Sequence, residues 1–215
     1  NAPATVSFST PSITVPGRGS ASFDVTVAAN AGLANRSLYG GYVTLTPQGG
    51  GETLRVPYAG LVGDYQSTQI LTPTPNGFPW LAQLSGTSLQ QRAAGGTYTL
   101  TGNDLPYFLL HLDHHARKIE FSVFNAANGK PVHPVFNTTD LFEYVGRNAT
   151  PGGFFAFTWD GTRMHDNGKG TPDHRKVVPN GQYKIVMRVL KPLGDEGNAA
   201  HWETWTSPTI TLARP

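Results

Sequence analysis

The alternation of apolar and polar residues predicts short β-strands along the first 65 residues. In residues 20–27, Phe23, Val25 and Val27 point to one side and the polar residues between them point to the other, which is the period of a half-buried strand. Turn-forming Gly and Pro residues separate the segments. Further strands are expected at residues 5–8, 12–15, 38–45 and 52–58. So many short strands in so few residues predict a small β-sandwich.

The same period returns in the second half of the chain. Strand-like segments with one apolar side are expected at residues 108–112, 118–124, 154–159, 183–189 and 204–212. We expect the apolar members of these strands to face a core: Ile119, Phe121, Val123, Phe155, Phe157, Trp159, Tyr183, Ile185, Met187 and Val189. The pattern weakens between residues 66 and 97, where Thr-Pro-Thr-Pro-Asn-Gly at 72–77 excludes a regular strand interior. No long helical periodicity is present.

These segments predict an all-β chain with two tandem β-sandwiches. The expected first sandwich is residues 1–66, a connecting segment follows at 67–97, and the second sandwich is residues 98–215. The chain begins at Asn1 without a Met or a signal peptide, so we expect a fragment of a longer protein.

Composition narrows the function classes. There is no cysteine, which excludes thiol catalysis and thiolate metal sites and is compatible with secretion for a chain of 215 residues. The formal net charge of +2 is too small for a nucleic-acid surface, and no apolar stretch of about 18 residues predicts a membrane span. We therefore expect no nucleic-acid and no membrane partner.

Two motifs in the first half carry a family resemblance. Residues 38–45 read Leu-Tyr-Gly-Gly-Tyr-Val-Thr-Leu, and residues 54–65 read Leu-Arg-Val-Pro-Tyr-Ala-Gly-Leu-Val-Gly-Asp-Tyr. Together they resemble the fibronectin-III-like domain that follows the catalytic domain in cell-envelope and secreted subtilisin-family proteases. The resemblance covers most of residues 4–65.

Three motifs in the second half carry another. Residues 157–161 (Phe-Thr-Trp-Asp-Gly) and 178–183 (Val-Pro-Asn-Gly-Gln-Tyr) resemble the immunoglobulin-like domain of the flagellar hook-capping protein and the C-terminal modules of many subtilases, and residues 200–208 resemble the last strand in that subtilase subset. The two resemblances imply tandem immunoglobulin/fibronectin-III-like sandwiches in a non-catalytic, extracellular accessory region. The implied partner is the catalytic domain of a parent serine protease. The alternative is a free-standing module that binds a glycan or a protein through exposed aromatic residues.

The sequence around Ser88 is similar to a protease nucleophile motif. Ser85-Gly86-Thr87-Ser88 is similar to the subtilase motif, but the Met and Pro that accompany that motif are missing and no His precedes His111. A serine without a base and an orienting acid is inert, so we expect no catalytic residues.

Histidines and acidic residues suggest two metal candidates. If residues 111–115 continue a strand, His111, Asp113 and His115 share one face and His114 lies opposite. We expect a structural role for this cluster, with an adventitious metal as the alternative. The weak calcium candidates Asp160, Asp166, Asn167 and Asp173 share a Gly-rich loop whose spacing fits no EF-hand. We expect turn-stabilising roles there, no cofactor, and at most weak calcium binding.

The four tryptophans offer a last alternative. Trp80, Trp159, Trp202 and Trp205 would suit sugar stacking if they were exposed together. Packing in a core or at its rim is the simpler expectation for tryptophan in a β-sandwich.

Overall fold

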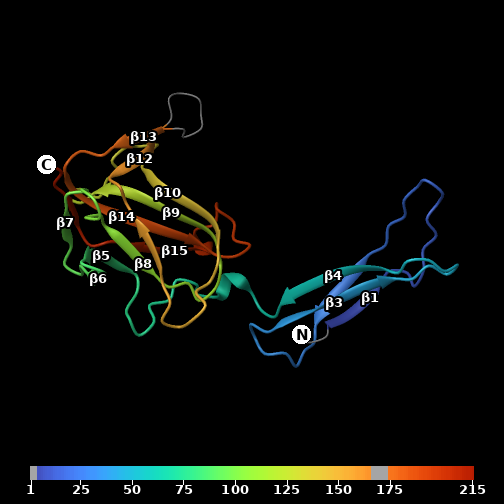
Figure 1. The fold of residues 1–215 in the computed structure, drawn as a ribbon. Coiled ribbons are helices and arrows are strands. Elements are labelled where there is room, and N and C mark those ends of the chain that lie inside the picture. The colour runs from blue at the N-terminus through green and yellow to red at the C-terminus, as the bar shows by residue number, and fades with distance from the viewer. Residues whose placement is uncertain (1–3, 166–173) are drawn as a thin grey trace. The chain divides into compact units, whose positions relative to one another are not determined.

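The computed structural model describes residues 4–165 and 174–215 and shows an all-β protein (Figure 1). The chain divides into two compact units, Asn1–Asp64 and Tyr65–Pro215. Residues 67–97 lie inside the second unit, so our expectation of a separate connecting segment there is wrong.

The first unit contains two antiparallel pairs of strands. Strands β1 (Ala4–Phe8) and β2 (Val25–Ala29) form one pair, and β3 (Leu38–Leu45) and β4 (Leu54–Leu61) form the other. The predicted strand at 12–15 is not paired in the structure, and residues 9–24 form a long connection instead. The strand expected at 20–27 begins only at Val25, because among the described residues no neighbouring strand lies beside its first half.

The second unit is a sandwich of two larger sheets. One sheet has the order β10-β9-β14-β16-β7, with β15 also on β14, and the other has the order β11-β8-β5-β6. A two-stranded sheet, β12-β13, is not part of either ladder but contacts β10, where Arg175 bonds Thr139 and Asp140. The strands are β5 (Trp80–Ser85), β6 (Ser88–Gln91), β7 (Gly96–Tyr98), β8 (Tyr107–Leu110), β9 (Ala116–Asn125), β10 (Thr138–Val145), β11 (Phe155–Thr158), β12 (Thr162–His165), β13 (His174–Val177), β14 (Gly181–Leu190), β15 (Trp202–Thr206) and β16 (Ile210–Leu212).

The core of the second unit lies between its two large sheets. It is built from the predicted apolar faces of β9 and β14, with Phe108 and Leu110 from the opposite sheet. Trp159 is fully buried among them, and Phe155 and Phe157 pack against this cluster from one side. The predicted shared face of these three aromatic residues is therefore confirmed.

Two elements of the second unit depart from the sequence pattern. Strands β5 and β6 occupy the segment with the weak pattern because β5 pairs with β8, a distant part of the chain. The predicted polar loop after Trp159 instead contains the β12–β13 pair. Two short 3-10 helices, Tyr65–Ser67 and Ala199–His201, complete the described elements. Among the residues that the structure describes, no helix has the length and apolar character needed to cross a bilayer.

Candidate functional site

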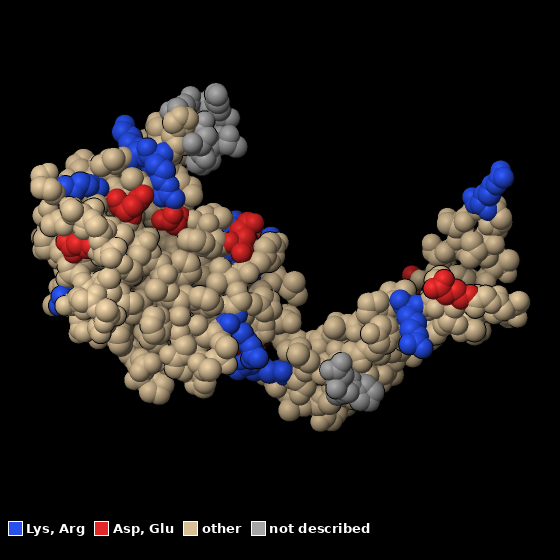
Figure 2. All heavy atoms as spheres, viewed as in Figure 1, with Lys and Arg blue, Asp and Glu red and all other residues tan. Residues whose placement is uncertain are grey.

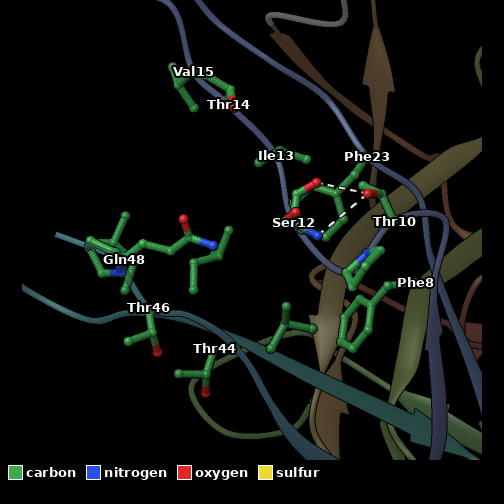
Figure 3. A pocket seen from close by; sticks show the side chains of 15 residues that line it. Phe8, Thr10, Ser12, Ile13, Thr14, Val15, Phe23, Thr44, Thr46 and Gln48 are labelled. Atoms are coloured by element: carbon green, nitrogen blue, oxygen red, sulfur yellow. Dashed lines mark hydrogen bonds between the residues drawn. The ribbon is translucent and has the colours of Figure 1, made fainter. Parts of the chain in front are cut away.

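An open groove of about 610 Å³ lies in the first unit. Residues 10–15 form one wall, and residues 44–48 at the end of β3 form the other (Figure 3). Phe8, Phe23, Val43 and Leu54 line the groove between these walls. None of the fifteen lining residues carries a charge.

The groove exists because the inner faces of the two strand pairs are incompletely covered. Val43 is the single buried side chain among described residues 4–64. Phe8 remains 49% exposed and Leu54 58% exposed, although the register of each strand places them on its apolar side. A sandwich normally buries the residues on such inner faces. The first unit therefore offers apolar surface to a partner.

Close packing between Tyr and Gly shapes the β3–β4 pair. Gly41 lies opposite Tyr58, and Gly60 lies opposite Tyr39, so each glycine faces an aromatic ring across the two strands. A Cβ atom at Gly41 would lie 2.6 Å from the Tyr58 hydroxyl oxygen, and a Cβ at Gly60 would collide with the Tyr39 ring. Gly41 and Gly60 thus leave room for the rings of Tyr58 and Tyr39 on the neighbouring strand.

The wall at residues 10–15 is held by a local turn. The Thr10 hydroxyl donates to the Ser12 carbonyl at 2.7 Å, as the dashed lines in Figure 3 show. Phe8 and Phe23 meet at a ring distance of 6.3 Å beneath this turn. These contacts fix where the wall begins, and residues 13–15 continue the wall along the groove.

A second, polar hollow of about 440 Å³ lies in the second unit. Its lining includes His111, Asp113, Arg147, Thr72 and Thr150. His111 is buried, and its Nδ1 lies 2.7 Å from the Gly153 carbonyl, which accepts a hydrogen bond in the tautomer that carries the proton on Nδ1. The ring is thereby fixed in the wall of a polar pocket.

The histidine cluster is arranged differently from our expectation. Strand β8 ends at Leu110, so the alternation of faces does not continue through residues 111–115. The rings of His114 and His115 lie 4.4 Å apart, and both contact Tyr65 edge-on, so the prediction that His114 lies opposite the other members is wrong. Burial, followed by the neighbouring His114, lowers the pKa of His115. The cluster packs against the segment that opens the second unit.

That opening segment is fastened by one carboxylate. Glu203 accepts hydrogen bonds from the backbone N–H groups of Ile70 and Leu71 at 2.9 and 2.7 Å. The Lys191 ammonium lies 3.7 Å from Glu203 and donates to the Gln66 carbonyl at 2.6 Å. Charge-assisted hydrogen bonds of this kind are stronger than neutral ones, so the start of the second unit is held firmly to its β15 strand.

Of the four calcium candidates, Asp160 lies within the described residues. Asp160 accepts hydrogen bonds from the N–H and hydroxyl of Thr162 at 2.9 and 2.6 Å, the arrangement of a turn-stabilising side chain. Asp166, Asn167 and Asp173 lie outside the described residues. Within the described part of the chain, no group of three or more His, Cys, Asp or Glu residues is placed to hold a metal ion. Weak calcium binding stays a prediction.

Ser88, which the nucleophile-like motif contains, lies in a β-hairpin. Ser85 and Ser88 are partners at the end of the β5–β6 pair, and Gly86 between them has a φ of +60°. The subtilase motif instead opens a buried helix, so the local geometry here is that of a tight turn.

The four tryptophans do not form a common platform. Trp159 is fully buried and donates from its indole nitrogen to the Thr162 carbonyl at 2.7 Å. Trp80 packs on Phe78 at 5.0 Å, and Trp202 lies under the Arg188 guanidinium at 4.1 Å. Each ring is engaged with its own neighbours.

Charged side chains are spread thinly over the face shown in Figure 2. Lys and Arg lie singly or in small groups, with Asp and Glu among them. The described residues include ion pairs such as Arg175 with Asp140 at 2.6 Å and Lys118 with Glu196 at 2.6 Å. The surface in this view has no extended basic or acidic field.

Comparison with known proteins identifies the first unit. A family model described as an Fn3-like domain matches residues 1–59, which include β1 to β3 and most of β4. No curated protein matches the chain. The fibronectin-III-like part of the sequence resemblance is confirmed. Domains of this type are accessory β-sandwich modules and are typically non-catalytic.

The groove was not foreseen from the sequence. The signal that could have revealed it is the pair of prolines, Pro11 and Pro16, on either side of the predicted strand at 12–15. Proline cannot donate to a ladder of hydrogen bonds, so a strand between two prolines is expected at an edge rather than inside a sheet.

Proposed function

We propose that this chain is a non-catalytic accessory region of a secreted subtilisin-type serine protease. The observation that carries the proposal is the Fn3-like match of residues 1–59, on the same motifs that resemble the domain following the catalytic domain in such proteases. In this role the first unit packs against the parent protein, and the second unit extends or stabilises the assembly outside the cell.

The gene itself and an activity assay test this proposal. The reading frame that encodes the chain is expected to encode a subtilase catalytic domain upstream, and the isolated chain is expected to leave casein intact. A reading frame with no protease domain would remove the parent from the account. Casein hydrolysis that disappears in Ser88→Ala would contradict the accessory role itself.

A second candidate function is a module that binds glycans or proteins by itself. The polar pocket around His111 favours it, because imidazole, carboxylate, guanidinium and hydroxyl groups together can satisfy the hydroxyls of a sugar. Screening the chain on a glycan array, with His111→Ala as the comparison, separates this candidate from the first. Binding that the variant loses would favour the free-standing module.

A further inference from the structure

Residues 13–15 are a strand-forming segment without a strand partner. Ile13-Thr14-Val15 has the β-branched composition that favours strands, and all three residues line the groove. Within the described part of the chain, the backbone groups of these three residues make no hydrogen bond. A row of unpaired N–H and C=O groups is a template for pairing with another strand.

Proline restricts the backbone at the two ends of this segment and limits its length. Thr10 and Val15 each precede a proline, which biases both toward β or polyproline conformations. Pro16 has no N–H to donate, so a ladder of hydrogen bonds along this edge must end before it. A strand that pairs along this edge can therefore form only a short ladder of hydrogen bonds.

The groove beside the segment sets the chemistry of the partner. Because all fifteen lining residues are neutral, a charged side chain entering the groove would lose water without gaining an opposite charge. Phe8 and Leu54 offer half-exposed apolar surface below the opening. A strand shows side chains alternately on its two sides, so every second residue of a bound strand would meet that surface.

We propose that the groove binds an extended, uncharged peptide strand, which pairs with the backbone of residues 13–15 and places alternate apolar side chains over Phe8 and Leu54. Strand addition of this kind draws affinity from main-chain hydrogen bonds and specificity from the pockets for alternate side chains. The inference rests on the geometry of the groove and not on a protease parent.

Peptide binding to the full chain tests the proposal. The probe is a blocked hexapeptide of alternating Thr and Val, titrated into the 15N-labelled chain. Saturable shifts are expected at the amides of residues 12–15, 44–46 and 48. Two further peptides carry N-methyl groups on alternate residues, one for each edge of the strand. At least one of them should bind tenfold more weakly, because the methyl groups remove the donors on the edge that pairs.

A charged substitution in the wall provides the protein control. Val15→Asp should weaken binding of the hexapeptide at least tenfold, whereas Val177→Asp places the same charge at an exposed position outside the groove and should leave the affinity unchanged. If Val15→Asp unfolds the first unit, the N-methylated peptides still test the proposal, because their binding is measured on the unchanged chain.

Three results would overturn the proposal. The first is no saturable shift up to millimolar peptide, and the second is equal affinity for all three peptides. The third is a concentration-dependent dimer in light scattering whose interface maps to residues 12–15, which would assign the groove to a second copy of the chain.

Discussion

Replacing Trp159 by alanine should strongly destabilise the second unit and spare the first. The side chain is 0% exposed, its indole nitrogen donates to the Thr162 carbonyl at 2.7 Å, and its ring meets Tyr183 at 6.0 Å with an interplanar angle of 83°. Truncating a buried Trp to Ala costs about 3–5 kcal/mol through lost transfer energy and the cavity left behind. The Thr162 carbonyl loses its partner as well, which adds about 1–3 kcal/mol if no water replaces the indole.

Calorimetry of the full chain measures this loss directly. A cost of about 1 kcal/mol lowers the melting temperature of a domain of this size by roughly 2–4 °C, so the transition of the second unit should fall by about 6 °C or more. The transition of the first unit should not move. Trp202→Ala is the matched control, because that ring is partly exposed on Arg188 and should cost much less. An unchanged second transition in the Trp159 variant would refute our description of the core.

Four further changes have defined outcomes. Gly60→Val should destabilise the first unit alone, by about 1–3 kcal/mol in a denaturant titration, because its side chain collides with Tyr39; an unchanged midpoint would contradict the ring packing. Glu203→Gln should speed hydrogen exchange at the two backbone amides that the carboxylate binds, and exchange equal to that of the parent chain would show that the carboxylate does not hold them. The pKa of His115 is lowered in the folded chain, so the unfolded chain binds a proton at this residue more readily. The stability that neutral His115 contributes is therefore present above about pH 6.5 and is lost as the pH falls below that value. Melting temperatures measured across this range should show the decline, and the decline should be smaller in His115→Asn. Calorimetric titration with CaCl2 should give no submicromolar affinity, and tight binding lost in Asp160→Asn would show that the turn is a calcium site.

The sequence correctly predicted the strands in which apolar and polar residues alternate regularly. Strand β3 spans the predicted residues 38–45, and Ile119, Phe121 and Val123 are buried as their period of two requires. These residues could be placed because one face of each strand is apolar throughout its length, so local pattern and tertiary burial agree.

The strand predictions were wrong where pairing with a distant part of the chain determines whether a segment becomes a strand. Strand β5 follows a proline-rich stretch that hides its pattern, and it becomes a strand by pairing with β8. Residues 12–15 show the opposite case, since a good local pattern has no neighbouring strand in the described chain. The same gap produces the groove, which is why the candidate site could not be found by searching for catalytic or metal-binding motifs.

The thermal inactivation half-life of the parent protein tests the accessory role most directly. The protease is produced with and without residues 1–215, and its activity on casein is followed at elevated temperature. The account predicts that both forms hydrolyse casein at first and that the form lacking residues 1–215 loses activity faster. Equal half-lives, with equal initial activity on large and small substrates, would contradict a stabilising or substrate-positioning role for this chain.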